Sequence, residues 1–181
     1  RPFTNRFAAA IRQVDPGALI LLGTDPQMLP PAWGPEDAPG MVYAPHWYDG
    51  VVLFLKTYLP WLGVDTSTRR LVLGAGRVKR SFTRQLLRFK ENSARLMNNV
   101  PTLIGEIGIA FDINQRRAFH SGNFRSQEKA LDRTLRAADE ALISYTIWNY
   151  NPDNNNERGD QWNGEDLSIF LGEERERPLD L

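Results

Sequence analysis

Four short segments of this chain are apolar almost throughout, and segments with the apolar spacing of helices lie between them. These predicted strands cover residues 18–22, 41–44, 102–107 and 144–148. Strands that are apolar on both faces are typical of a parallel sheet covered by helices. The sequence therefore predicts an α/β fold of about four βα units, which is half of a (β/α)₈ TIM barrel. A complete barrel typically needs ~250 residues, more than the 181 of this chain, and a half-barrel would leave two open sheet edges.

Three segments show the apolar spacing of amphipathic helices, and a fourth is less regular. The helices are predicted at residues 3–14, 81–99 and 127–143, and residues 51–62 read as a short helix or an irregular aromatic segment. The basic residues of 81–99 are expected to form a solvated face. Gly74–Arg77 matches a phosphate-binding glycine motif only in part and is predicted to be a turn.

Composition excludes several classes of protein. The chain has 22 basic and 22 acidic residues, whereas nucleic-acid-binding domains are usually strongly basic. It has no Cys and only two His, so we expect neither a metal site nor a cofactor. No apolar run approaches the roughly 18 residues of a membrane span.

Polar and aromatic residues follow three of the predicted strands. They are His46, Trp47, Tyr48 and Asp49 after the second strand, Glu106 in the third, and Trp148, Asn149 and Tyr150 after the fourth. A barrel places all its strand ends on one rim, so these side chains are expected to share one pocket. Aromatic rings, an imidazole, amides and carboxylates suit a sugar. Structural roles for three of these residues stay open at this point. Glu106 could cap a helix or form an ion pair, His46 could be a packed imidazole, and Trp148 could be a core side chain.

Three motifs in this order resemble the last strands of glycoside hydrolase family 5. They are Tyr-Ala-Pro-His-Trp-Tyr at 43–48, Ile-Gly-Glu-Ile-Gly at 104–108 and Ile-Trp-Asn-Tyr at 147–150. The segment 148–169, with Trp-Asn-Tyr-Asn-Pro-Asp-Asn and Gly-Asp-Gln-Trp-Asn-Gly-Glu-Asp-Leu-Ser-Ile, is similar to a narrower branch. That branch holds endoglycoceramidases, glucosylceramidases and steryl glucosidases.

The resemblance implies a retaining β-glycosidase with Glu106 as the catalytic nucleophile. Trp148 matches the aromatic platform under the sugar, and His46 and Tyr48 match residues that orient the substrate and the nucleophile. Trp47 and Asn149 are also predicted to bind substrate. The resemblance places the acid/base Glu after an Asn at the end of an earlier strand, and no such pair ends an apolar strand here, so we expect it in a missing N-terminal half.

Other acidic residues are weaker candidates for that role, because carboxylates in such loops mostly cap turns. These residues are Asp49, Glu157, Asp160, Glu165 and Asp166. The aromatic residues of the loops are expected either to line an apolar rim for a lipid or sterol, or to pack within the fold. They are Trp33, Trp47, Phe54, Tyr58 and Trp61.

The predicted organisation is one half-barrel at residues 1–172, followed by a charged tail at 173–181 that reads as a truncated linker. Expected partners are a carbohydrate or glycolipid substrate and either the missing N-terminal half or a second copy, with no nucleic acid and no transmembrane segment. The isolated chain is expected to be inactive or to aggregate.

Two other functions compete with this interpretation. One is a non-catalytic half-barrel that binds glycans or lipids and oligomerises. The other is a barrel enzyme of a different reaction type, such as an aldolase. The second is disfavoured because no Lys ends a predicted strand, as a Schiff base would require; the lysines are Lys56, Lys79, Lys90 and Lys129.

Overall fold

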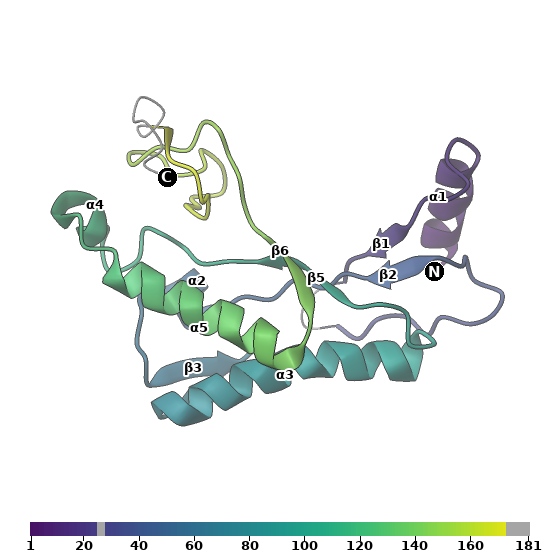
Figure 1. Ribbon diagram of the computed structural model, residues 1–181, viewed down its shortest axis with the longest axis horizontal. Helices are drawn as coiled ribbons and strands as arrows, with labels where there is room; N and C mark the ends of the chain where they lie inside the picture. The colour runs from purple at the N-terminus through teal and green to yellow at the C-terminus, as the bar shows by residue number, and fades with distance from the viewer. Residues whose placement is uncertain (25–27, 173–181) are drawn as a thin grey trace.

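The computed structural model describes residues 1–24 and 28–172 and shows an α/β architecture (Figure 1). Its helices are α1 (Pro2–Arg12), α2 (Gly50–Leu55), α3 (Ala75–Leu96), α4 (Arg117–Ser121) and α5 (Arg125–Ala141). Its strands are β1 (Ile20–Leu22), β2 (Met41–Tyr43), β3 (Leu62–Asp65), β4 (Arg70–Leu73), β5 (Leu103–Ile107) and β6 (Ser144–Ile147). The predicted charged tail lies outside the described residues.

The parallel strands follow one another in the order of the sequence. β1 pairs with β2 and β5 pairs with β6, both in parallel. Parallel bridges between Tyr43 and Thr102 and between His46 and Glu106 join the β2 segment to β5. Four predicted strands therefore exist as strands, and the α/β class is confirmed.

The long helices α3 and α5 lie side by side and cover the strands (Figure 1). On α3 the buried positions Val78, Phe82, Leu86 and Phe89 recur every three to four residues, which is the spacing of one helix face. They pack in one core with strand residues such as Ile104. Burying each large side chain contributes roughly 1.5–3 kcal/mol to the stability of the fold. The apolar residues whose spacing indicates a helix are therefore also the ones that bind it to the core.

The connection between β2 and α3 departs from the prediction. The short helix expected in residues 51–62 is α2, which ends at Leu55. Residues 62–73 form an antiparallel hairpin of β3 and β4, which the sequence did not predict. The turn of this hairpin lacks Gly, Pro and Asn; the carboxylate of Asp65 forms it instead by accepting hydrogen bonds from Ser67 and Thr68.

The predicted turn at Gly74–Arg77 is wrong. Gly74 is the N-cap of α3 with φ 96°, and the helix begins at Ala75. The short helix α4 was also not predicted. Within the described ranges, no helix has the length and apolar content needed to cross a membrane.

Candidate active site

Glu106 lies near the end of β5 and meets two side chains of the segment that follows β2. Its Oε2 accepts a hydrogen bond from the Tyr48 hydroxyl at 3.1 Å and lies 3.1 Å from Nδ1 of His46. The Trp47 amide donates to the Glu106 carbonyl at 2.9 Å, which fixes the register of the two segments. The side chain of Glu106 is 23% exposed, so a ligand can reach a carboxylate that is held on one side.

Tyr48 is suited to donate a hydrogen bond to this carboxylate. Burial raises the pKa of the Tyr48 phenol well above its usual value, and the negative charge of Glu106 raises it further. The phenol therefore stays protonated at neutral pH and orients one oxygen of Glu106. The charge of Glu165 also raises the pKa of Tyr48, which places this loop residue within electrostatic range of the site.

The two glycines beside Glu106 serve the approach of neighbouring strands rather than of a ligand. A Cβ on Gly105 would lie 3.0 Å from the Ala44 carbonyl oxygen. A Cβ on Gly108 would overlap the carbonyl oxygen of Trp148. Gly108 needs glycine because backbone from the β6 segment fills the space, and at Gly105 the Ala44 backbone leaves a tight fit.

Trp148 and Asn149 follow β6 on the other side of β5. The Trp148 amide donates to the Ile107 carbonyl at 2.9 Å, the Trp148 side chain is partly exposed, and the Trp148–Asn149 peptide bond is cis. Asn149 donates to Asp160 of the following loop at 3.3 Å. The structure thus places the ends of β2, β5 and β6 side by side, whereas the shared pocket stays a prediction.

Trp47 is a correction to the predicted set of substrate-binding residues. It is 2% exposed, its ring packs edge-on against Phe82 at 4.9 Å, and its indole donates to Gln85 at 3.2 Å. The chain stays extended here, so His46 and Tyr48 point to one side and Trp47 to the other. That alternation was readable in the sequence, and Trp47 supports the site from the core.

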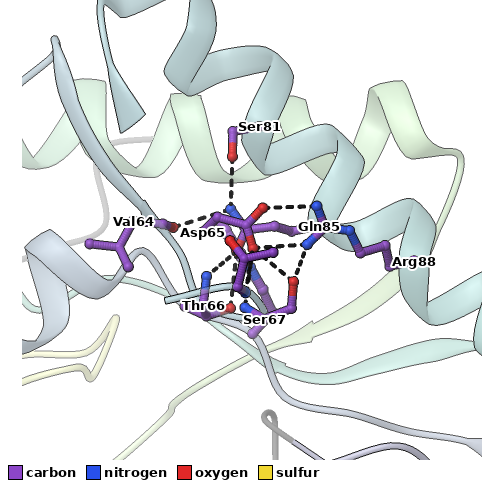
Figure 2. Close-up of polar contacts among 9 residues, drawn as sticks. Val64, Asp65, Thr66, Ser67, Ser81, Gln85 and Arg88 are labelled. Carbon is purple, nitrogen blue, oxygen red and sulfur yellow. Dashed lines mark hydrogen bonds and ion pairs between the residues drawn. The ribbon is translucent and has the colours of Figure 1, made fainter. Parts of the chain in front are cut away.

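The Gln85 amide connects Trp47 to the β3–β4 hairpin. Figure 2 shows Gln85 among Val64, Thr66 and Ser81, with Arg88 beside Asp65. Arg88 donates to both carboxylate oxygens of Asp65 at 2.8 Å. A polar network therefore fixes the hairpin to α3. The same network binds Trp47, which lies between His46 and Tyr48 in the chain.

The aromatic residues considered for an apolar rim divide between the core and the surface. Trp33 is 6% exposed and belongs to the core, as Trp47 does. Phe54 and Trp61 are 77% and 51% exposed, so these two side chains remain available for contact.

The candidate substitutes for the acid/base residue have structural roles. The carboxylate of Asp49 forms a buried ion pair with Arg133 and caps α2 through the Val51 amide. Asp160 and Asp166 are buried in the loop after β6, where both accept from Asn154, and burial raises the pKa of Asp166.

The two remaining candidates differ in exposure. Glu157 is exposed, and the Glu165 carboxylate accepts from the Asn163 amide. Among the described carboxylates, Glu106 alone contacts Tyr48 and His46. None of the five candidate substitutes does so.

A cavity of about 600 Å³ lies between the end of α2 and the α4–α5 region. None of its lining residues is one of the predicted site residues. Among the residues with described positions, no group of three His or carboxylate side chains is placed to hold a metal ion.

This arrangement of strands and site residues corresponds to a known family. The family model for cellulase, glycosyl hydrolase family 5, matches residues 1–154. The chain therefore belongs to glycosyl hydrolase family 5.

Individual relatives narrow the comparison. The chain is 30% identical over 179 residues to a glucosylceramidase of Rhizopus delemar, covering 94% of this chain and 26% of that protein. It is 31% identical to an ergosteryl-beta-glucosidase of Saccharomyces cerevisiae, covering 74% of this chain and 19% of that protein. The crystal structure of Cryptococcus neoformans sterylglucosidase 1 with tris superposes with a TM-score of 0.85 at 30% identity, covering 92% of this chain and 25% of that one. The chain spans about a quarter of the length of these relatives.

Alkaline pH should reduce the free energy of unfolding, because burial raises the pKa of both Tyr43 and Tyr48 in the folded protein. In the unfolded chain both phenols ionise near pH ~10. Above that pH the unfolded state binds fewer protons than the folded state, so stability falls by up to about 1.4 kcal/mol per pH unit and tyrosine. In urea unfolding between about pH 8 and 11, the free energy of unfolding should fall less steeply with pH for Tyr48→Phe than for the unchanged protein. Tyr150→Phe, at a tyrosine that is 66% exposed, is the control; an equal slope in both variants would contradict the assignment.

Proposed function

We propose that this chain forms part of the active site of a retaining β-glycosidase, with Glu106 as the nucleophile. The observation that carries the proposal is the pair of contacts to one oxygen of Glu106, from Tyr48 and His46. Holding one oxygen leaves the other oxygen of the carboxylate for attack on the anomeric carbon. Trp148 lies across β5 from these donors and offers a ring for the sugar.

The reaction needs a second carboxyl group. Retaining hydrolysis uses two of them about 5–5.5 Å apart, one attacking and one protonating the leaving oxygen. Because none of the described candidates contacts Tyr48 or His46, we assign the acid/base role to a glutamate outside these 181 residues. Residues 1–172 would then supply the last four βα units of the barrel, and a preceding half would supply the rest.

The substrate class we propose is a β-glucoside of glycolipid type, such as glucosylceramide or a steryl glucoside. The names of the glucosylceramidase and ergosteryl-beta-glucosidase relatives support this class. The exposed Phe54 and Trp61 follow the site segment in the chain and offer apolar contacts for an aglycone.

Labelling with 2-deoxy-2-fluoro-β-glucosyl fluoride tests the proposal. The activated fluoride leaves with little acid assistance, so the reagent reports the nucleophile alone. Intact mass and peptide mapping should find one sugar adduct on Glu106 in the protein expressed with its natural flanking sequence. A folded protein that turns over an aryl β-glucoside but carries the adduct elsewhere would overturn the assignment.

A non-catalytic half-barrel that associates with another chain is the second candidate. Apolar side chains on α1 and β1 favour it, since Phe3 is 72% and Leu21 is 55% exposed. Such exposure is typical of surfaces that contact another body. Glycan binding that survives Glu106→Ala, in a protein without turnover, would select this function.

A further inference from the structure

The segment of residues 56–90, which contains the β3–β4 hairpin and most of α3, carries a positive charge that the rest of the chain compensates. Residues 56–90 contain nine Lys and Arg and one Asp, a net charge of +8, whereas the whole chain has a net charge of zero. The one Asp, Asp65, is already paired with Arg88. A segment this basic has a positive potential of its own.

Four arginines of this segment are gathered at one groove. The groove, of about 430 Å³, lies between β4 and the first turns of α3 and is lined by Arg70, Arg77, Arg80 and Arg84. All four are exposed, and within residues 1–24 and 28–172 none of them forms an ion pair. Guanidinium groups in this state suit the phosphates of a polyanion.

Large apolar side chains are exposed on the same hairpin. Leu71 and Leu73 are 71% and 53% exposed and share one face of β4, because residues two apart in a strand point the same way. Trp61, at 51% exposure, precedes β3, and its carbonyl accepts a hydrogen bond from the Gly74 amide at 2.7 Å. Leu71 also lines the groove of the arginines. Exposed apolar side chains near clustered Arg are typical of surfaces that bind a bilayer, whereas nucleic acids need no aliphatic contacts.

This surface lies at the same end of the molecule as Glu106. The hairpin belongs to the connection that leaves the carboxyl end of β2, where His46 and Tyr48 lie. Figure 1 shows β3 beside the beginning of α3, at the end where α4 and the beginning of α5 follow β5.

We propose that β4 and the first half of α3 form a docking surface for a lipid bilayer with anionic phospholipid headgroups. The arginines bind headgroup phosphates, and Trp61, Leu71 and Leu73 enter the interface between headgroups and acyl chains. The inference rests on the proposed function in one respect: a glycolipid presents its sugar at headgroup level, and docking here would bring Glu106 to that sugar. Of these four arginines, only Arg84 lies in the range 81–99, whose basic residues were expected to form a solvated face.

Vesicle sedimentation of the protein, expressed with its natural flanking sequence, tests the surface. The vesicles are phosphatidylcholine alone and phosphatidylcholine with phosphatidylserine. Binding should require phosphatidylserine and weaken with added salt. Each basic residue near an anionic surface contributes about 1 kcal/mol, or roughly fivefold, so the Arg77→Gln, Arg80→Gln, Arg84→Gln triple variant should bind at least about tenfold more weakly.

Two matched variants separate charge from apolar contact. Arg6→Gln, Arg95→Gln and Lys129→Gln remove the same charge from exposed positions elsewhere and should change binding less than about twofold. Leu71→Ser with Leu73→Ser keeps the charge and should also weaken vesicle binding. Two results would overturn the proposal. One is an equal loss of vesicle binding in the two triple Gln variants. The other is full vesicle binding by the leucine variant, together with binding of single-stranded DNA as strong as that of the vesicles.

Turnover of a soluble aryl β-glucoside separates this proposal from the proposed function. All these variants should keep that turnover, which also shows that they fold. Vesicle binding without any turnover would refute the proposed glycosidase activity and support the docking surface. Turnover without vesicle binding would refute the docking surface and leave the glycosidase standing.

Discussion

Replacing Glu106 by Gln should lower kcat on an aryl β-glucoside by at least about 10⁴-fold, in the protein expressed with its natural flanking sequence. The change keeps the size of the side chain and its place beside Tyr48 and His46 but replaces the nucleophilic carboxylate by a neutral amide. Losing a catalytic nucleophile typically costs several orders of magnitude in kcat. Steady-state kinetics measures the loss, and KM should change far less than kcat.

A smaller variant distinguishes a nucleophile from a structural acid. Glu106→Gly leaves space beside the anomeric carbon, and added azide should restore turnover and yield an α-glucosyl azide. Glu36→Gln, at an exposed glutamate in the loop before β2, should keep full activity. If azide restores nothing in a folded Glu106→Gly protein, Glu106 is not the nucleophile.

Replacing Asp49 by Ala should lower the free energy of unfolding by about 3–5 kcal/mol. The Asp49–Arg133 ion pair is almost fully buried, with side-chain exposures of 1% and 4%, and removing one partner leaves an uncompensated buried charge. Domains of this size are stable by only about 5–15 kcal/mol, so chemical denaturation should show a large shift of the midpoint.

An exposed ion pair in α5, the helix that holds Arg133, is the matched control. Asp132 and Arg136 lie 2.8 Å apart with exposures of 57% and 67%, and Asp132→Ala should cost no more than about 0.5 kcal/mol. The double variant Asp49→Ala with Arg133→Met should be more stable than Asp49→Ala alone, because no charge is left unpaired. Equal costs for Asp49→Ala and Asp132→Ala would show that the buried pair does not stabilise the fold.

The strands and the long helices could be predicted because burial leaves apolar runs in strands and periodic apolar positions in helices. Residues 127–143 contain the apolar stripe that became α5 (Arg125–Ala141), and the apolar runs became the parallel strands. The ends of these strands then placed His46, Tyr48 and Glu106 together. The family resemblance predicted the same site independently and is confirmed at the level of glycosyl hydrolase family 5.

The hairpin could not be predicted because long-range contacts form it. Its turn has no Gly or Pro, and Arg69 adopts a positive φ of 56°. Asp65 and Arg88 are 23 residues apart, and nothing local in the sequence marks them as partners. The burial of Trp47 likewise depends on Gln85 and Phe82, which come from a distant helix.

The backbone bridge between His46 and Glu106 has a consequence for how such proteins can diverge. In an extended strand, inserting or deleting one residue turns every following side chain to the opposite face. A change of that kind between Tyr43 and His46, or between Thr102 and Glu106, would part the carboxylate from its donors while leaving the fold intact. Homologous genes should therefore tolerate length changes in residues 28–40, before β2, and a lineage that has lost the ancestral activity is expected to show them first in these two short intervals.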